Sequence, residues 1–184
     1  MITNAQIIGQ LGAFSDQEVA LFSRYSYTRV FKKGELLLRP GSFRASIYFL
    51  KQGSVVQYKK PDERERQYEN LYVENSWLFD NGIFDSQNRA ASYLEAFSDC
   101  DVVEVSLSSI HHLISLSSSF LALNKIFNSL ADRVNFLNAG YTPAEKYDLL
   151  VKSRPEVIRI FPLKVIASYL KISPETLSRV RAMA

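Results

Sequence analysis

The sequence contains little cysteine and histidine, which limits its redox and metal chemistry. The single cysteine, Cys100, excludes an internal disulfide, so a reducing cytoplasm is the expected compartment. The two histidines, His111 and His112, are adjacent. On a helix their side chains would diverge by about 100°, so they would not bind one metal ion together. With no cysteine cluster of the iron–sulfur type either, we expect no metal and no cofactor.

Two further kinds of pattern are absent. No apolar run approaches the length of a membrane-spanning helix, and the N-terminus lacks the basic, apolar and small-residue order of a secretion signal. The sequence also contains no glycine-rich loop for phosphate and no combination of nucleophile and base that would suit catalysis. We therefore expect a cytoplasmic protein that contacts no membrane and is not an enzyme.

The residues that are present suit a packed globular protein with an uneven distribution of charge. Apolar residues make up 47% of the sequence and aromatic residues 12%, as in a packed protein. The length of 184 residues is enough for one large domain or for a medium and a small one. The net charge of +3 is small. Residues 142–184, however, hold eight Lys or Arg against four Asp or Glu, whereas residues 1–141 hold fourteen against fifteen. Positive charge is thus concentrated near the C-terminus, as contact with nucleic-acid phosphates requires.

Residues 163–183 have the pattern of two short helices joined by a tight turn. Apolar residues recur on each helix at helical spacing: Ile166, Ala167, Leu170, Leu177 and Val180. Between the helices, Ser173 suits the N-cap and Pro174 suits the first helical position. The pattern predicts a helix-turn-helix whose second helix can enter the DNA major groove. An ordinary helical hairpin with a solvated polar face has the same spacing.

The run from Ile166 to Arg179 resembles the helix-turn-helix of Crp/Fnr-type bacterial transcription regulators. The resemblance covers the apolar positions, an alanine in the first helix, and four recognition-helix residues: Ser173, Glu175, Thr176 and Arg179. Lys171 stands where the family has a turn glycine. A lysine in the left-handed conformation expected there costs on the order of 1 kcal/mol. The family's β-hairpin wing has no counterpart before Ala184, so we expect a helix-turn-helix that lacks a wing.

The second helix would present a polar face once its apolar residues are turned inward. Arginine pairs bidentately with guanine and glutamate accepts a hydrogen bond from cytosine, so Arg179 and Glu175 are expected to read bases. The other members of the predicted DNA-binding set are suited to phosphates or to the helix N-terminus: Ser173, Thr176, Ser178, Arg181, Lys164 and Lys171.

Short apolar segments punctuated by glycine and proline predict a β-roll or jelly roll in the first part of the chain. Residues 33–38, 47–53 and 99–105 resemble recurring phrases of the cyclic-nucleotide-binding β-roll of the same family. The expected fold class is α+β, with a jelly roll (double-stranded β-helix), a long dimerisation helix and an all-α C-terminal domain. The expected domains are a sensor domain over 1–116, the dimerisation helix over 117–141 and the helix-turn-helix domain over 142–184.

A cyclic phosphate buried in such a roll needs main-chain N–H groups, an arginine and an acceptor for the ribose hydroxyl. The resemblance places the family's Gly-Glu pair near Asn75 and Ser76, and its Arg-Ser pair on Ala90 and Ala91. Arg89 is one residue too early, which in a strand directs its side chain to the other face. We therefore expect no response to cyclic AMP. The predicted pocket, open to another small-molecule effector or filled by its own aromatics, comprises Trp77, Phe79, Phe84, Arg89, Ala90, Ala91 and Tyr93.

An amphipathic segment follows Ser117. Its apolar residues recur at alternating spacings of three and four over about three heptads: Phe120, Leu123, Phe127, Leu130, Val134, Leu137 and Tyr141. The spacing predicts a coiled-coil seam, and the resemblance implies a dimerisation helix at this point. A helix packed only on its own β-roll would show the same spacing. In a dimer, two recognition helices would read inverted half-sites about one DNA turn apart.

Together these patterns predict a homodimeric, sequence-specific DNA-binding transcription regulator that recognises a palindromic site. The alternative is a small-molecule-binding sensor module whose helical tail contacts another protein and not DNA. The two hypotheses differ in whether the polar face of the last helix binds nucleic acid.

Overall fold

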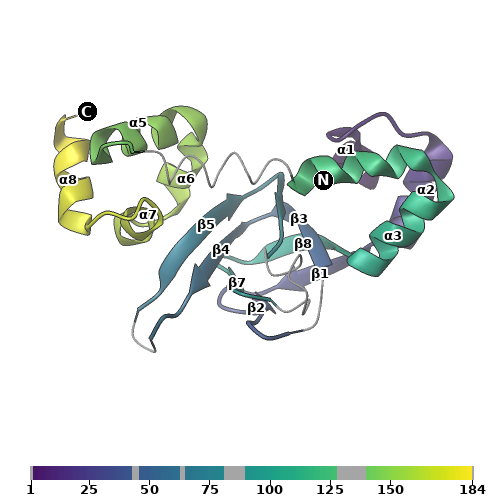
Figure 1. The fold of residues 1–184 in the computed structure, drawn as a ribbon, viewed down its shortest axis with the longest axis horizontal. Helices are drawn as coiled ribbons and strands as arrows, with labels where there is room; N and C mark the ends of the chain where they lie inside the picture. Colours follow the sequence, from purple (N-terminus) through teal and green to yellow (C-terminus); the bar gives the residue numbers. More distant parts are fainter. Residues whose placement is uncertain (1, 43–45, 63–64, 81–89, 128–139, 184) are drawn as a thin grey trace.

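Two four-stranded antiparallel sheets lie face to face, between two groups of helices (Figure 1). The computed structural model describes residues 2–42, 46–62, 65–80, 90–127 and 140–183. The strands are β1 (Tyr27–Phe31), β2 (Leu36–Leu38), β3 (Ser46–Gln52), β4 (Ser54–Lys59), β5 (Gln67–Val73), β6 (Ser76–Leu78), β7 (Tyr93–Ala96) and β8 (Cys100–Ser106). The helices are α1 (Asn4–Gly9), α2 (Asp16–Arg24), α3 (Leu107–Leu116), η2 (Ser118–Asn124), α5 (Pro143–Ser153), α6 (Pro155–Ile160), α7 (Leu163–Tyr169) and α8 (Pro174–Met183).

The strand order within each sheet is that of a roll, in which the chain passes repeatedly from one sheet to the other. Sheet A has the order β1-β8-β3-β6 and sheet B the order β2-β7-β4-β5. In sheet A, β3 pairs with β8 so that Ile47 lies opposite Val105 and Leu50 opposite Val102. The predicted β-roll within an α+β fold is therefore confirmed.

Both faces of the central strands are covered, which explains their nearly continuous apolar sequences. In β3 the side chains of Tyr48 and Leu50 enter a cluster between the two sheets, whereas Ile47 and Phe49 enter a second cluster on the outer face of sheet A. In sheet B, Val55 of β4 likewise contributes to the cluster between the sheets. Strands buried on both faces have apolar runs in place of strict alternation.

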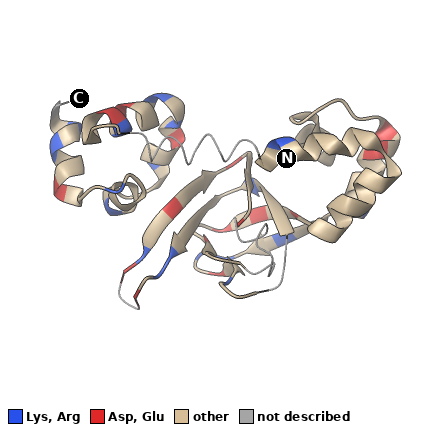
Figure 2. Ribbon diagram, viewed as in Figure 1, with Lys and Arg blue, Asp and Glu red and all other residues tan. Residues whose placement is uncertain are grey.

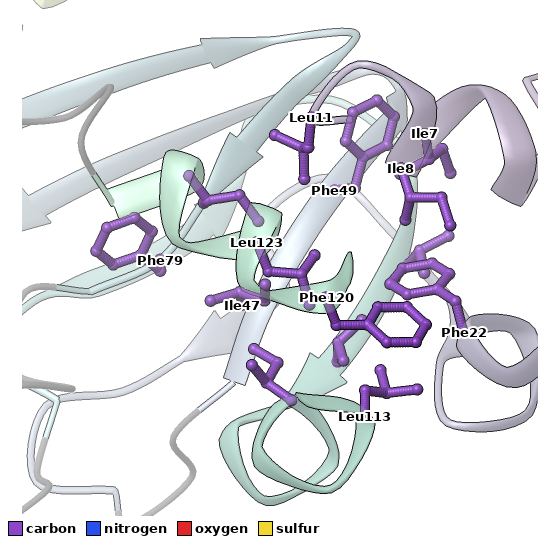
Figure 3. Packing of buried hydrophobic residues seen from close by; sticks show 14 residues of the cluster. Ile7, Ile8, Leu11, Phe22, Ile47, Phe49, Phe79, Leu113, Phe120 and Leu123 are labelled. Carbon is purple, nitrogen blue, oxygen red and sulfur yellow. The ribbon is translucent and has the colours of Figure 1, made fainter. Parts of the chain in front are cut away.

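The N-terminal helices and η2 cover the outer face of sheet A (Figure 3). Ile7 and Ile8 of α1, Phe22 of α2 and Phe49 of β3 have no exposed surface. Burying an aliphatic or phenyl side chain of this size contributes about 1.5–3 kcal/mol relative to leaving it in water. The helices and the β-roll thus share one core.

The first residues of the predicted dimer seam belong to this same core. Phe120 and Leu123 are completely buried in it (Figure 3). The half-buried Phe127 packs against the same core and meets Phe79 with ring centroids 5.0 Å apart. In addition, Ser118–Asn124 forms a 3₁₀ helix and not the expected α-helix. At these positions the correct interpretation is therefore intramolecular packing, because side chains with no exposed surface offer a partner subunit nothing to contact.

Of the later residues of the predicted seam, Leu130, Val134 and Leu137 lie outside the described residues. Tyr141 is 42% exposed. Dimerisation through residues 117–141 therefore stays a prediction.

The carboxylate of Glu18, on α2, connects that helix to the start of η2. The Ser117 hydroxyl donates a hydrogen bond of 2.6 Å to Glu18 Oε1, and the Ser15 main-chain N–H donates one of 2.7 Å to Oε2. These hydrogen bonds lower the pKa of the Glu18 carboxyl to about 2, and the bond from Ser117 contributes most. The contact is therefore complete above the ordinary carboxyl pKa of 4.5 and is lost as the pH falls toward 2.

Candidate nucleic-acid interface

The turn before α8 has the two hydrogen bonds of a Schellman motif. Ile172 N–H donates to Ala167 O (3.0 Å) and Lys171 N–H donates to Ser168 O (3.1 Å), which closes the C-terminus of α7. Lys171 occupies the left-handed position of this motif, with φ of 57°. The left-handed conformation predicted for this lysine is confirmed.

Replacing Lys171 by glycine is expected to stabilise the protein by about 1 kcal/mol. Glycine adopts the left-handed conformation without the steric cost that a Cβ atom incurs. Chemical denaturation of the wild type and Lys171→Gly measures the difference in free energy of unfolding. Lys164→Gly is the matched control: Lys164 is exposed within α7, and glycine inside a helix is expected to destabilise by about 1 kcal/mol. Equal destabilisation by the two substitutions would contradict the argument.

The start of α8 is capped as the sequence predicts. Ser173 Oγ accepts a hydrogen bond of 3.1 Å from Thr176 N–H, and Pro174 is the first residue of the helix. The half-buried Thr176 also forms hydrogen bonds within this turn. Its Oγ1 accepts from the Ser173 hydroxyl at 3.1 Å and from Arg179 Nη2 at 3.5 Å. Ser173 and Thr176 therefore shape the N-terminus of α8.

The rest of α8 is divided between a buried and an exposed face. Leu177 is completely buried against the other C-terminal helices. The exposed members of the predicted DNA-binding set are Ser173, Glu175, Ser178, Arg179 and Arg181 on or next to α8, with Lys164 on α7 and Lys171 in the turn. Figure 2 shows acidic and basic positions together along α8. Seven of the eight predicted DNA-contacting residues are thus exposed, and Thr176 is half-buried.

Glu175 carries its charge at neutral pH. Its own main-chain N–H, followed by the Ser173 hydroxyl, holds the pKa of the Glu175 carboxyl below its ordinary value, with a smaller contribution from Arg179. An ionised carboxylate accepts hydrogen bonds and donates none. Glu175 is therefore suited to accept from the amino group of a base.

The C-terminal helices are held on the β-roll through sheet B. Ser168 Oγ of α7 accepts from Tyr68 N–H (3.3 Å) and donates to Arg66 O (3.4 Å), and Arg154 Nη2 donates to Leu71 O. These bonds occupy main-chain groups of β5 and the residue before it, at an edge of sheet B that would otherwise be open for pairing. The rings of Phe97 and Phe161 meet 4.9 Å apart in the same contact.

This attachment leaves the last helix turned away from the sheets. Helix α8 packs on α5 and α7, and Figure 1 shows it at the end of the molecule distant from the strands. Its polar face is therefore not covered by the β-roll in this arrangement.

The predicted ligand pocket is not assembled. Trp77 and Phe79 pack in the cluster on the outer face of sheet A, where the Trp77 ring meets Phe49 at 5.1 Å. Tyr93 stacks on Tyr58 at 5.0 Å in the contact with the C-terminal helices, on the opposite side of the roll.

Of the remaining predicted pocket residues, Ala90 packs against the cluster between the sheets and Ala91 is exposed. Phe84 and Arg89 lie outside the described residues. The grouping fails because the described members pack in different layers of the fold: Trp77 and Phe79 outside sheet A, Ala90 between the sheets and Tyr93 outside sheet B.

One buried polar residue next to this segment escaped the sequence interpretation. Asp80 is 3% exposed, and the main-chain N–H groups of Ala91 and Ser92 donate to its two carboxylate oxygens. Its sequence context, an Asp followed by Asn and Gly, is that of an ordinary exposed turn. No local signal distinguishes it from such a turn.

The described residues offer little for catalysis or metal binding. Burial, and then the neighbouring carboxylates of Asp101 and Asp99, raise the pKa of the Cys100 thiol to about 11, which disfavours a reactive thiolate. Within the described ranges, His, Cys, Asp and Glu nowhere gather in threes as metal ligands would. No helix in the same ranges is both long and apolar enough to cross a membrane.

Comparison with known proteins identifies the β-roll. Residues 28–117 match the family model of the cyclic nucleotide-binding domain. No curated protein sequence matches the chain. Solved structures, in contrast, match it over nearly its whole length.

Three of these structures define the fold. One is CLP, the c-di-GMP responsive global regulator of Xanthomonas campestris, with a TM-score of 0.65 and 17% identity over 92% of this chain and 91% of that one. A second is a CooA mutant from Carboxydothermus hydrogenoformans, with a TM-score of 0.71 and 12% identity over 99% of this chain and 84% of that one. The third is the catabolite activator protein of Thermus thermophilus, with a TM-score of 0.53 and 17% identity over 93% of this chain and 84% of that one. Residues 28–117 are therefore similar to a cyclic nucleotide-binding domain, and the chain shares the fold of these three solved structures.

Proposed function

We propose that this protein is a homodimeric DNA-binding transcription regulator whose helix α8 reads the major groove at a palindromic site. The observation that carries the proposal is the exposed polar face of α8, which Leu177 anchors from the opposite side. On that face Arg179 supplies donors for guanine and Glu175 an acceptor for cytosine. The surplus of basic residues over 142–184 supplies attraction to phosphates.

Phosphate contacts fall to the residues around this reading pair. Lys171 and Arg181 are exposed cations near the two ends of α8, and Ser178 is an exposed hydroxyl between them. Lys164 is a further exposed cation, on α7. Contacts of this kind fix the position of a helix in the groove but carry no sequence information. Their loss should weaken binding to all sequences alike.

The rest of the chain has a regulatory role in this proposal. Residues 1–116 form the sensor, residues 117–141 contribute to dimerisation and residues 142–184 bind DNA. The hydrogen bonds from Ser168 and Arg154 to the β5 edge connect the first part to the last. A change in the β-roll could thus reposition the DNA-binding helices.

The substitution Arg179→Ala tests the reading role. If Arg179 grips a guanine, its loss is expected to weaken binding to the preferred site by about 1–3 kcal/mol and to relax the preference at one base pair of each half-site. The preferred site is first obtained by selecting wild-type protein against a pool of random duplexes. Binding of both proteins to that site and to single-base variants then gives the energies.

Arg159→Ala is the matched control for charge. Arg159 lies on α6 with its side chain 74% exposed, and its removal deletes the same charge without touching α8. It should leave the base preference unchanged. Selection of the same sequence at undiminished affinity by Arg179→Ala would exclude Arg179 from base reading.

A sensor module without DNA binding is the second candidate function. It is favoured by the docking of α7 on the edge of β5, because a helical tail held on the sensor can serve a protein contact. A titration with duplex DNA over a salt series separates the two functions. DNA binding that contacts several phosphates weakens steeply with salt, whereas absence of binding at low salt favours the sensor module.

A further inference from the structure

The hydroxyl of Thr176 lies between two other polar side chains at the start of α8. Thr176 Oγ1 accepts a hydrogen bond from the Ser173 hydroxyl at 3.1 Å and another from Arg179 Nη2 at 3.5 Å. The three residues are three positions apart, a spacing that makes side chains neighbours on the surface of a helix. Thr176 is half-buried, whereas Ser173 and Arg179 are exposed. A partly buried acceptor thus lies beside an exposed arginine.

Two features fix the position of Thr176 Oγ1. The branched Cβ of threonine restricts its χ1 angle, so that a helix allows mainly two rotamers. Ser173 selects between them, because its Oγ both donates to Thr176 Oγ1 and accepts from Thr176 N–H at 3.1 Å. Ser173 is itself held by its carbonyl oxygen, which accepts from Leu177 N–H at 3.0 Å. Thr176 Oγ1 is therefore an acceptor of fixed direction.

Arg179 has donors to spare for this contact. In the part of the chain that the structure describes, Arg179 forms no ion pair, so its positive charge is available to DNA. A guanidinium carries five N–H donors, of which bidentate pairing with guanine uses two. The hydrogen bond to Thr176 is therefore compatible with the reading of a base.

A contact of this kind changes binding because it restricts the arginine before DNA is present. Ordering one long, flexible side chain at an interface lowers the affinity by about three- to tenfold. A guanidinium that is already held in one orientation avoids part of this loss, and it approaches a base edge from one direction. The affinity and the base preference thus both depend on what holds Arg179.

We propose that Thr176 is a positioning residue for base reading, whose hydroxyl orients the Arg179 guanidinium and does not itself contact DNA. This inference rests on the proposed function, in which Arg179 reads a guanine. It separates Thr176 from the exposed residues that would contact phosphates, and its half-buried side chain suits a role within the protein.

The mobility of Arg179 in the full chain without DNA tests the contact directly. Thr176→Val removes the hydroxyl but keeps the main-chain N–H that donates to Ser173, so the cap of α8 remains. We expect the NMR order parameter of Arg179 Nε–H to be about 0.2 lower in Thr176→Val than in the wild type, on a scale where about 0.85 is rigid and below about 0.6 is flexible. Thr176→Ser, which retains the hydroxyl, should restore the wild-type value. Arg159, 74% exposed on α6, is the internal control and should not change.

A double-mutant cycle on DNA tests the consequence for reading. Thr176→Val is expected to lower the preference for the guanine that Arg179 reads by about three- to tenfold, and Thr176→Ser by less than about twofold. In the Arg179→Ala background, Thr176→Val should have no further effect on this preference. The salt dependence of binding should stay that of the wild type, because no phosphate contact is removed.

The outcomes distinguish failure of this inference from failure of the proposed function. An unchanged Arg179 order parameter in Thr176→Val would overturn the positioning role, and so would an equal loss of preference with and without Arg179. A loss that affects all sequences alike and reduces the salt dependence would instead make Thr176 a phosphate contact. If Arg179→Ala leaves base selection unchanged, Arg179 reads no base, and the reading role and the positioning role fall together.

Discussion

Phe120→Ala is expected to lower the free energy of unfolding by about 3–5 kcal/mol. Phe120 has no exposed surface, and its ring lies 5.4 Å from that of Phe14 in the cluster between sheet A and the N-terminal helices. Truncation to alanine removes its burial and leaves a cavity that the surrounding β-strands and helices close only in part. In a chain of this size the loss corresponds to a fall in Tm of about 2–4 °C per kcal/mol.

The neighbouring residue supplies the control. Leu121 is 51% exposed, so Leu121→Ala should change the free energy of unfolding by less than about 0.5 kcal/mol. Denaturant unfolding measures both energies, and sedimentation at the same protein concentrations measures subunit association. A small loss of stability in Phe120→Ala together with dissociation of an oligomer would place Phe120 at a subunit interface and contradict its assignment to the core.

This experiment addresses a distinction that spacing alone leaves open. Apolar residues at spacings of three and four indicate that a segment buries one face, but not which surface covers it. In the chain, α1 and α2 return to the outer face of sheet A and meet Phe120 and Leu123 there. That contact joins residues about a hundred positions apart, and no local pattern encodes it.

The turn before α8 was predictable because its causes are local. The N-cap of Ser173, the first-turn position of Pro174 and the left-handed conformation of Lys171 depend on residues within one or two helical turns. The strands of the roll were recognisable for a similar reason, since glycine and proline separate short apolar runs. Each of these features needs no knowledge of the distant chain.

The predicted pocket failed where the layer assignment of each side chain depends on tertiary packing. Trp77 and Tyr93 are aromatic residues of the same domain, yet they face opposite outer surfaces of the sandwich. Asp80 was missed because an acid before Asn and Gly indicates an exposed turn. Its burial depends on the amides of Ala91 and Ser92, which lie eleven and twelve residues further along the chain.

Gly53→Ala is expected to destabilise the protein by about 2–4 kcal/mol. Gly53 connects β3 to β4 with φ of 92°, a conformation that costs an L-residue about 1–2 kcal/mol. A Cβ atom at this position would also lie 2.3 Å from Asp99 O and 2.8 Å from Cys100 Cβ. The main chain at Asp99 would have to move, although its side chain is tied to Lys32 Nζ and Lys33 N–H at 2.9 Å each.

Gly34→Ala separates the cost of the backbone conformation from the cost of the steric clash. Gly34 has nearly the same backbone conformation, with φ of 87°, but a Cβ atom there would meet nothing within 4 Å. Its substitution should therefore cost only the conformational part, about 1–2 kcal/mol. Urea unfolding of both variants gives the difference, which measures the close approach of β8 to the turn between β3 and β4. Equal losses in the two variants would mean that the chain at Asp99 moves aside freely, and that this approach does not fix the position of the turn.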